Sequence, residues 1–399
     1  MTDHPVLGQV ALGYSPMIDR HKAITALRLT VFPVRPDALP DADALLAALA
    51  EAWPDPAQRV SLDIAGEGLL ESLLHTDLPL NMMLEVPAFM ASDLACSDAL
   101  AALHTRGNTL LIKGRPLQPL PREVLPCFAY SIIDLADERR DGMPPPGGVS
   151  RNIPHVQAGV RTMAQMTEAF GRGAIAVLGW PIDDPAPAKG AGGRGAQPEL
   201  QAIIELINRL DRHESLDRLE AVMKNDPTMA FKLMRYINSP LFGLSVEVSS
   251  FRHAIMLLGY QRLKRWLALL LAAGSRDAGQ KPVIYAAVRR GLLMEELGRD
   301  SGCDDERRGE LFICGVFSLL DRLMHQPFDE LLKSIPTSDA VRAALVHRNG
   351  PHQPYLALVQ AIESASLFDI RGAAEALMMT TEAVNQAVLR ALVAARQLD

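Results

Sequence analysis

The sequence lacks the features of several specialised classes of protein. Its 399 residues include four cysteines that form no CxxC pair, and we expect buried free thiols in a reducing compartment. The N-terminus has no basic segment followed by an apolar core, and no apolar run reaches the ~18 residues of a membrane-spanning helix. These absences predict a cytoplasmic protein with no membrane partner. The cysteines are Cys96, Cys127, Cys303 and Cys314.

A strong charge of one sign is also lacking. The formal net charge is −7, and 22% of the residues are charged, so no global electrostatic force favours nucleic acid or an anionic membrane. The ten histidines include no His-Asp dipeptide. In the C-terminal half, His253, His325, His347 and His352 are isolated, and a metal site needs ligands that converge. The sequence therefore predicts no nucleic-acid partner and no metal in this half.

Length and pattern together predict two domains. A chain of 399 residues exceeds what one hydrophobic core usually supports. Up to residue 182, strand-like runs alternate with helix-like runs, which favours a parallel sheet with crossover helices, either doubly wound or closed into a barrel. Strands are expected at 10–18, 24–33, 59–64, 82–86, 109–112, 128–134, 155–160 and 175–180, and helices at 41–53, 66–75, 91–104 and 163–170.

Two segments are too rich in proline and glycine for regular structure. Residues 136–154 read ADERRDGMPPPGGVSRNIP and cannot form a crossover helix. A barrel would be interrupted there, or the segment would form an extended flap. Residues 183–198 read DDPAPAKGAGGRGAQP, which is the composition of a linker. The predicted domains are therefore 1–182 and 199–399, joined by a Pro/Ala/Gly linker at 183–198.

The second domain is predicted to be all-helical. Apolar residues recur at helical spacing, and short polar, Gly or Pro joints separate the helices. The most patterned stretch is 225–274, in which Asn238 and the following Ser-Pro stop one helix and Gly259 ends the next. Further helices are expected at 283–299, 307–324, 329–334, 339–347, 355–366, 370–377 and 381–397.

This patterned stretch carries a family resemblance. Its runs NDPTMAFKLMRYINSPLFG and SSFRHAIMLLGYQRLKRWL resemble the signature of the HDOD domain, an all-helical relative of the HD phosphohydrolases that lacks their metal ligands. A second stretch, ICGVFSLLDRLMHQPFDELL at 313–332, is similar to the same family. The resemblance extends from about residue 198 to near the C-terminus. It implies a helical domain without catalytic metal.

The N-terminal domain resembles a second family. Residues 16–33, PMIDRHKAITALRLTVFP, resemble a heavily eroded opening of an EAL domain, the barrel that hydrolyses cyclic di-GMP. The order of the two domains resembles that of the YuxH-type EAL–HDOD signalling proteins. The predicted fold class is therefore multidomain α/β plus all-α. It combines a degenerate EAL-type, TIM-like barrel, complete or interrupted near 136–154, with an all-helical HDOD domain.

Most catalytic residues of the EAL family are absent. Carried over by position, the Glu that opens the EAL motif falls at Arg28, and the paired Asp of the family's DDF motif fall at Lys113 and Gly114. The family's last Glu falls at Arg161, and its Asn ligand falls at Asp63. Other positions of the family pattern are changed at Phe32, Ala88, Ile132 and Leu178.

Two acidic residues of the family pattern survive, as Glu85 and Asp134. Two-metal phosphodiester hydrolysis needs several carboxylates that converge on the cations. Arg28, Lys113 and Arg161 would instead place positive charge where the cations bind. The resemblance therefore implies that this domain is not an enzyme and holds no metal or other cofactor.

The function that remains is regulatory. We interpret the chain as a non-catalytic bacterial signal-transduction protein that acts through protein–protein interaction with unidentified signalling proteins. One alternative is a receptor that binds cyclic di-GMP, or another cyclic dinucleotide, without hydrolysis, since basic side chains attract phosphate. A second alternative is a residual metal-dependent phosphodiesterase. The basic cluster Arg262, Lys264 and Arg265 is either an interaction edge of the HDOD domain or the solvated start of a buried helix.

Overall fold

The chain folds into two compact units. The computed structural model describes residues 4–35, 38–116, 120–137, 153–184, 198–215, 218–219, 251–273, 278–335 and 337–396. Unit 1 contains Met1–Asp184 and two C-terminal segments, Gln360–Glu375 and Thr380–Gln386, and the remaining residues form unit 2. The predicted domain boundaries stay a prediction, and residues 185–197 of the predicted linker lie outside the described residues.

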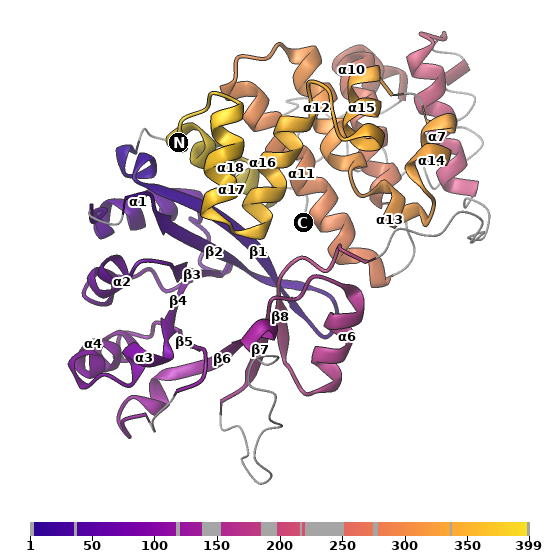
Figure 1. Ribbon diagram of the computed structural model, residues 1–399. Helices are drawn as coiled ribbons and strands as arrows, with labels where there is room; N and C mark the ends of the chain where they lie inside the picture. Colours follow the sequence, from indigo (N-terminus) through magenta and orange to yellow (C-terminus); the bar gives the residue numbers. More distant parts are fainter. Residues whose placement is uncertain are drawn as a thin grey trace. The chain divides into compact units, whose positions relative to one another are not determined.

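Unit 1 is built on a closed barrel of eight strands that adjoin one another in the order of the sequence (Figure 1). All eight strands expected from the sequence are confirmed. Their bounds are β1 Val10–Asp19, β2 Ile24–Pro33, β3 Val60–Ile64, β4 Met82–Pro87, β5 Leu110–Lys113, β6 Phe128–Asp134, β7 His155–Ala158 and β8 Ala176–Leu178.

The directions of the strands are mixed. β1 is antiparallel to both β2 and β8, whereas all other neighbouring pairs are parallel. The prediction of a wholly parallel sheet is therefore wrong for β1. Residues 20–23 alone join β1 to β2, and such a short connection turns the chain back, because a parallel neighbour needs a long crossover.

The barrel is not interrupted between β6 and β7. These strands pair directly, from Ser131 opposite His155 to Asp134 opposite Ala158. The prediction left open a break near 136–154, and the structure corrects it: the chain there connects two neighbouring strands without opening the sheet. Residues 138–152, where an extended flap was the other expectation, lie outside the described residues.

Helices cover the outside of the barrel, and polar side chains define where several of them begin. Asp41, Asp93 and Thr162 accept backbone N–H groups at the first turns of α1, α4 and α6. The short helix α3, which directly follows β4, was not predicted. The helices of this part are α1 Ala42–Ala52, α2 Glu67–Leu74, α3 Ala88–Ala91, α4 Leu94–Thr105 and α6 Met163–Gly171, with 3₁₀ turns at Pro5–Gly8 and Leu125–Cys127.

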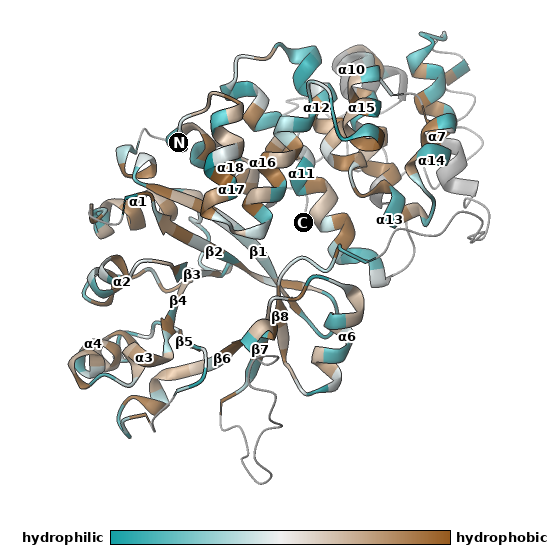
Figure 2. Ribbon diagram, viewed as in Figure 1, coloured by the Kyte–Doolittle hydropathy of each residue, from teal (hydrophilic) through white to brown (hydrophobic). Residues whose placement is uncertain are grey.

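The C-terminal half is helical, as predicted, and its helices carry both hydrophobic and hydrophilic residues (Figure 2). Gly259 has φ 73° and ψ 168° inside α10, which confirms that one helix ends there. The predicted helix 307–324 is divided into α12 and α13. The stop at Asn238 lies outside the described residues. The helices are α7 Pro198–Asp211, α10 Phe251–Ala273, α11 Lys281–Asp300, α12 Asp305–Phe317, α13 Leu320–Met324, α14 Phe328–Ser334, α15 Asp339–His347, α16 Gln353–Ser364, α17 Leu367–Ala376 and α18 Thr381–Arg396.

The cysteines and the longest helices were the subject of two predictions drawn from absences. The four cysteines are free thiols, but the prediction that they are buried is wrong for Cys96 and Cys303, which are partly exposed, and right for Cys127 and Cys314. Among the helices that the structure describes, none is long and apolar enough to cross a membrane.

Candidate functional site

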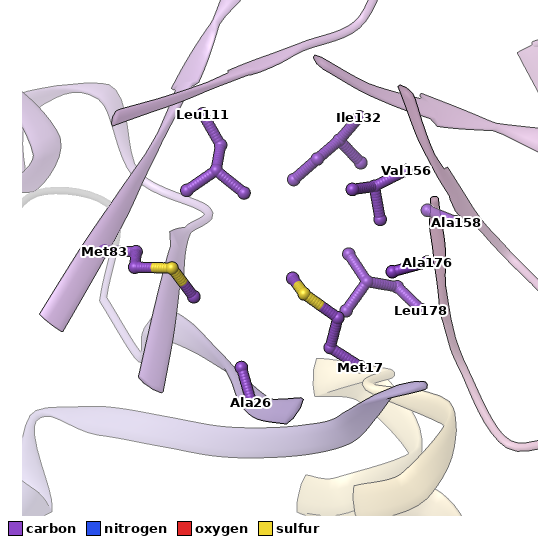
Figure 3. Close-up of a cluster of buried hydrophobic side chains, with 9 residues drawn as sticks. All are labelled: Met17, Ala26, Met83, Leu111, Ile132, Val156, Ala158, Ala176 and Leu178. Carbon is purple, nitrogen blue, oxygen red and sulfur yellow. The ribbon is translucent and has the colours of Figure 1, made fainter. Parts of the chain in front are cut away.

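The inside of the barrel has an apolar floor. Side chains two residues apart on a strand point to the same face of the sheet. Figure 3 shows nine side chains that converge from the surrounding strands on the barrel axis. Together they form one buried hydrophobic cluster: Met17, Ala26, Met83, Leu111, Ile132, Val156, Ala158, Ala176 and Leu178.

A layer of charged side chains follows this floor. Two residues beyond Ala26, Met83 and Leu111 in the chain lie Arg28, Glu85 and Lys113, which therefore face the same interior. Asp63 lies opposite Thr30 in the register of β2 and β3. Because each step follows the strand direction, the charges lie toward the carboxyl ends of the parallel strands, where barrel enzymes place their active sites. We call this end of the barrel the mouth.

Four of these residues form what we call the ion cluster: Arg28, Asp63, Glu85 and Lys113. The Arg28 guanidinium donates from Nε and Nη2 to the two carboxylate oxygens of Glu85, at 2.9 and 2.6 Å. The same Nη2 lies 3.0 Å from Asp63 Oδ2. Lys113 Nζ donates to Asp63 Oδ1 at 2.5 Å. Arg28 thus bridges both carboxylates, and Lys113 neutralises the second one.

Two hydroxyl groups complete the cluster, and the sequence did not indicate them. Ser61 donates to Glu85 Oε1 at 2.9 Å, and Thr30 donates to Asp63 Oδ2 at 3.3 Å. Both lie one strand away from the carboxylate that they contact. The register of β2, β3 and β4 brings these hydroxyl groups there. They could therefore have been predicted only if the pairing of the strands were already known.

Burial and charge act against each other in this cluster. Burial opposes the charge of Arg28, but Glu85 and Asp63 outweigh it and raise the pKa of the guanidinium. Burial also disfavours the Asp63 carboxylate, yet the charges of Arg28 and Lys113 hold the pKa of Asp63 below its usual value. At Glu85 complete burial outweighs Arg28, so the pKa of this carboxyl is raised. Its contacts are nevertheless all donors, the arrangement that an ionised carboxylate accepts.

The ion cluster does not fit a divalent metal ion. Each carboxylate oxygen of Asp63 and Glu85 already accepts a bond from Arg28, Lys113, Ser61 or Thr30. A cation would have to displace a guanidinium or an ammonium group that lies within 3.0 Å of these oxygens. Across the described ranges, no group of three or more His, Cys, Asp or Glu side chains is placed to hold a metal.

The other two predicted positions of the barrel differ in their relation to the cluster. Asp134 contributes to the field that raises the pKa of Arg28, and its carboxylate accepts the backbone N–H of Ala136 at 2.7 Å. Arg161 instead forms a partly exposed ion pair with Asp183, at 2.7 Å. The structure therefore brings Arg28, Asp63, Glu85 and Lys113 together, with Asp134 near them, and gives Arg161 a separate partner.

The predicted basic edge of the helical domain is largely neutralised. Arg265 donates to both carboxylate oxygens of Glu295, each at 2.5 Å, and its guanidinium lies 4.1 Å from the centre of the Phe312 ring. Lys264 pairs with Asp211. Arg262 lies in α10, and its side chain is outside the described set. These contacts favour a role for Lys264 and Arg265 in holding helices of unit 2 together.

One family model and two curated relatives match parts of the chain. Residues 198–328 match the family model of the HDOD domain. The chain is 27% identical over 176 residues to the uncharacterized protein YuxH of Bacillus subtilis, covering 43% of this chain and 42% of YuxH. It is 27% identical over 199 residues to the cyclic di-GMP phosphodiesterase CdgJ of Vibrio cholerae, covering 50% of this chain and 46% of CdgJ.

Among solved structures, the chain is similar to the FimX EAL domain of Pseudomonas aeruginosa bound to c-di-GMP. The TM-score is 0.29 and the identity 11%, over 45% of this chain and 93% of that domain. The chain spans less than half the length of the two curated relatives that it matches. The predicted HDOD domain is confirmed at residues 198–328, and in this chain it follows a closed eight-stranded barrel, as the resemblance to EAL–HDOD proteins predicted.

Proposed function

We propose that this protein is a non-catalytic signal-transduction protein of the EAL–HDOD type, which acts through protein–protein interaction. The observation that carries this proposal is the position of Arg28, which bridges Asp63 and Glu85 in the barrel mouth. Metal-assisted hydrolysis of a phosphodiester needs carboxylates that are available to cations and a water oriented between them. In this barrel both carboxylates already form ion pairs with Arg28 or Lys113.

The substrate for the test is taken from the name of one curated relative. CdgJ is named a cyclic di-GMP phosphodiesterase, so cyclic di-GMP is the substrate that a retained activity would use. The full chain is incubated with cyclic di-GMP and excess Mg²⁺ or Mn²⁺, and the linear dinucleotide is quantified by chromatography. CdgJ is assayed in parallel as the positive control.

We expect product at the level of the buffer blank for this protein and turnover for CdgJ. Metal-dependent formation of the linear dinucleotide that scales with protein concentration would sink the proposal. A variant, Glu85→Gln, separates a contaminating enzyme from this site, because only activity that belongs to the mouth depends on Glu85.

A second candidate function is a receptor that binds a cyclic dinucleotide without cleaving it. The observation in its favour is Lys113, whose side chain is 42% exposed at the mouth and so retains donors that can reach a phosphate. Titration calorimetry of the full chain with cyclic di-GMP tests it. Lys113→Met should abolish binding, and Lys281→Met, which removes an exposed lysine at the start of α11, should not. Absence of heat with the unchanged chain would end this candidate.

A further inference from the structure

One edge of β1 is only partly paired with another strand. β1 pairs with β2 along nearly its whole length, from Val10 opposite Pro33 onward. With β8 it pairs only from Met17 to Asp19. Unpaired backbone N–H and C=O groups in a buried place are costly. The first half of β1, which is fully buried from Val10 to Tyr14, therefore needs other partners on that edge.

Side chains supply these partners. Asn385, in α18, donates from its amide nitrogen to the carbonyl oxygens of Leu7 and Val10, at 2.7 and 2.6 Å, and accepts the backbone N–H of Leu12 at 3.0 Å. The Trp180 indole donates to Tyr14 O at 3.0 Å. Asn385 is 1% exposed, and its amide uses one acceptor and both donors. It thus takes the place of a missing strand at Val10 and Leu12 of β1 and also binds Leu7 in the preceding 3₁₀ turn.

The backbone of β1 at Gly13 lies close to the chain that follows α16. A Cβ atom at Gly13 would lie 2.9 Å from both Cα and Cβ of Ala365, closer than side chains tolerate. A Cβ at Gly8 would lie 3.7 Å from Glu382, which is ordinary contact. Glycine at position 13 is therefore required for the chain after α16 to lie against β1, whereas Gly8 is not.

This contact lies one strand away from the ion cluster. Gly13 is opposite Thr30 in the register of β1 and β2. Thr30 donates to Asp63, and Asp63 holds Lys113. A displacement of β1 at Gly13 is therefore transmitted through one strand pair to the hydroxyl that orients Asp63.

We propose that Gln360–Glu375 and Thr380–Gln386, which we call the C-terminal clamp, regulate the barrel by holding β1 and, through Thr30, the geometry of the ion cluster. Both helices at the ends of the clamp continue beyond it: α16 begins before Gln360 and α18 extends past Gln386. Five residues after Asn385, Arg390 of the same α18 binds Glu296 and Asp300 of α11 at 2.7 and 2.6 Å.

The clamp makes the charge at the barrel mouth dependent on the contacts of Asn385 and Ala365 with β1. This inference does not depend on whether the mouth binds a nucleotide, since it concerns the exposure of Lys113 alone.

The experiment compares three variants of the full chain. Asn385→Ala removes the anchor, Gly13→Ala adds a Cβ that clashes with Ala365, and Gly8→Ala is the matched control that adds a Cβ without a clash. Hydrogen exchange read by mass spectrometry follows the amides of β1. Losing the acceptor of a buried N–H should speed exchange of Leu12 about tenfold or more. Gly8→Ala should exchange like the unchanged chain.

The regulatory readout is the rate at which an amine reagent modifies Lys113. Freeing an ion pair of ~1 kcal/mol corresponds to about a fivefold faster reaction, and we expect this in Asn385→Ala and Gly13→Ala. Lys264, paired with Asp211 in unit 2, is the internal control and should keep its rate. Faster exchange at Leu12 with an unchanged rate at Lys113 would show that the clamp is only structural and would overturn the proposal. So would unchanged exchange in both variants. Far-ultraviolet circular dichroism identifies a variant that has unfolded, and the variant that stays folded then decides the question.

Discussion

Replacing Arg28 by methionine is expected to destabilise the barrel strongly. The substitution keeps an unbranched side chain of similar length and removes the guanidinium. Glu85, whose side chain is fully buried, then loses its two bonds from Arg28 and keeps one from Ser61. Asp63 is affected less, because Lys113 still donates to it. The cost of the substitution therefore falls mainly on one buried carboxylate.

The magnitude follows from that uncompensated charge. Removing one partner of a buried ion pair costs about 3–5 kcal/mol, because the other charge is left without compensation. Replacing both partners by apolar side chains is often neutral or stabilising by about 1–4 kcal/mol. The double variant Arg28→Met/Glu85→Leu should therefore recover most or all of the loss. If the buried Glu85 is the cause, the free energy of unfolding should fall in Arg28→Met and recover in the double variant.

The assay has to report the barrel by itself, since the chain contains two compact units. Of the three tryptophans in the sequence, Trp53 and Trp180 belong to the barrel unit and Trp266 to the other. In a Trp266→Phe background, tryptophan fluorescence during urea unfolding follows unit 1. The free energy of unfolding is extrapolated to water for each variant.

Arg161→Met is the matched control. Its pair with Asp183 is 41% and 47% exposed, and exposed pairs contribute about 0–1 kcal/mol. A smaller loss of stability in Arg28→Met than in Arg161→Met would refute the role of Arg28. A double variant less stable than Arg28→Met would do the same, because the buried charge of Glu85 would then not be the cause.

Two further predictions concern other buried polar groups. His352 is buried, and burial lowers its pKa below the ordinary 6.5 although Glu310 opposes this. The unfolded chain therefore takes up a proton first as the pH falls below 6.5, so the contribution of neutral His352 to stability is present above that pH and lost below it. His352→Gln should flatten the fall of the melting temperature of unit 2, followed by Trp266 fluorescence in a Trp53→Phe/Trp180→Phe background, and an unchanged slope would contradict this. Trp180→Phe removes the bond to Tyr14 O and should cost about 1–3 kcal/mol in the urea assay, read from Trp53; no change would mean that another group replaces it.

The strands of the barrel could be predicted because their physics is local. Short apolar runs of β-branched residues, with turn residues between them, mark strands wherever the chain later places them. The floor and the charged layer follow the same alternation, so Ala26 and Arg28, or Met83 and Glu85, could be assigned to one face from the sequence. The family resemblance then ordered these charges around a common site, and the structure brings four of them together.

What could not be predicted depends on contacts between distant parts of the chain. The short connection between β1 and β2 makes β1 antiparallel to β2. That β1 is also antiparallel to β8 follows only from the closure of the barrel. Ser61 and Thr30 reach the ion cluster through strand register. Asn385 binds β1 from more than 370 positions away in the chain, and nothing in the helical pattern of α18 distinguishes it from a solvent-facing amide. Long-range partners of this kind leave no periodic signal.

The ion cluster also indicates how many residues would have to change before this barrel could hold a metal ion. Asp63 is shared between Arg28, at 3.0 Å, and Lys113, at 2.5 Å. Replacing Arg28 alone by a carboxylate would leave the Lys113 ammonium at Asp63 and would add a third acidic group beside the buried Glu85. Replacing Lys113 alone would leave the guanidinium between Asp63 and Glu85. Each single change therefore has an electrostatic cost and still leaves no site for a metal ion. Arg28 and Lys113 would have to be replaced together to open one. This electrostatic cost is the physical basis of our proposal that the barrel has a regulatory role that needs no metal.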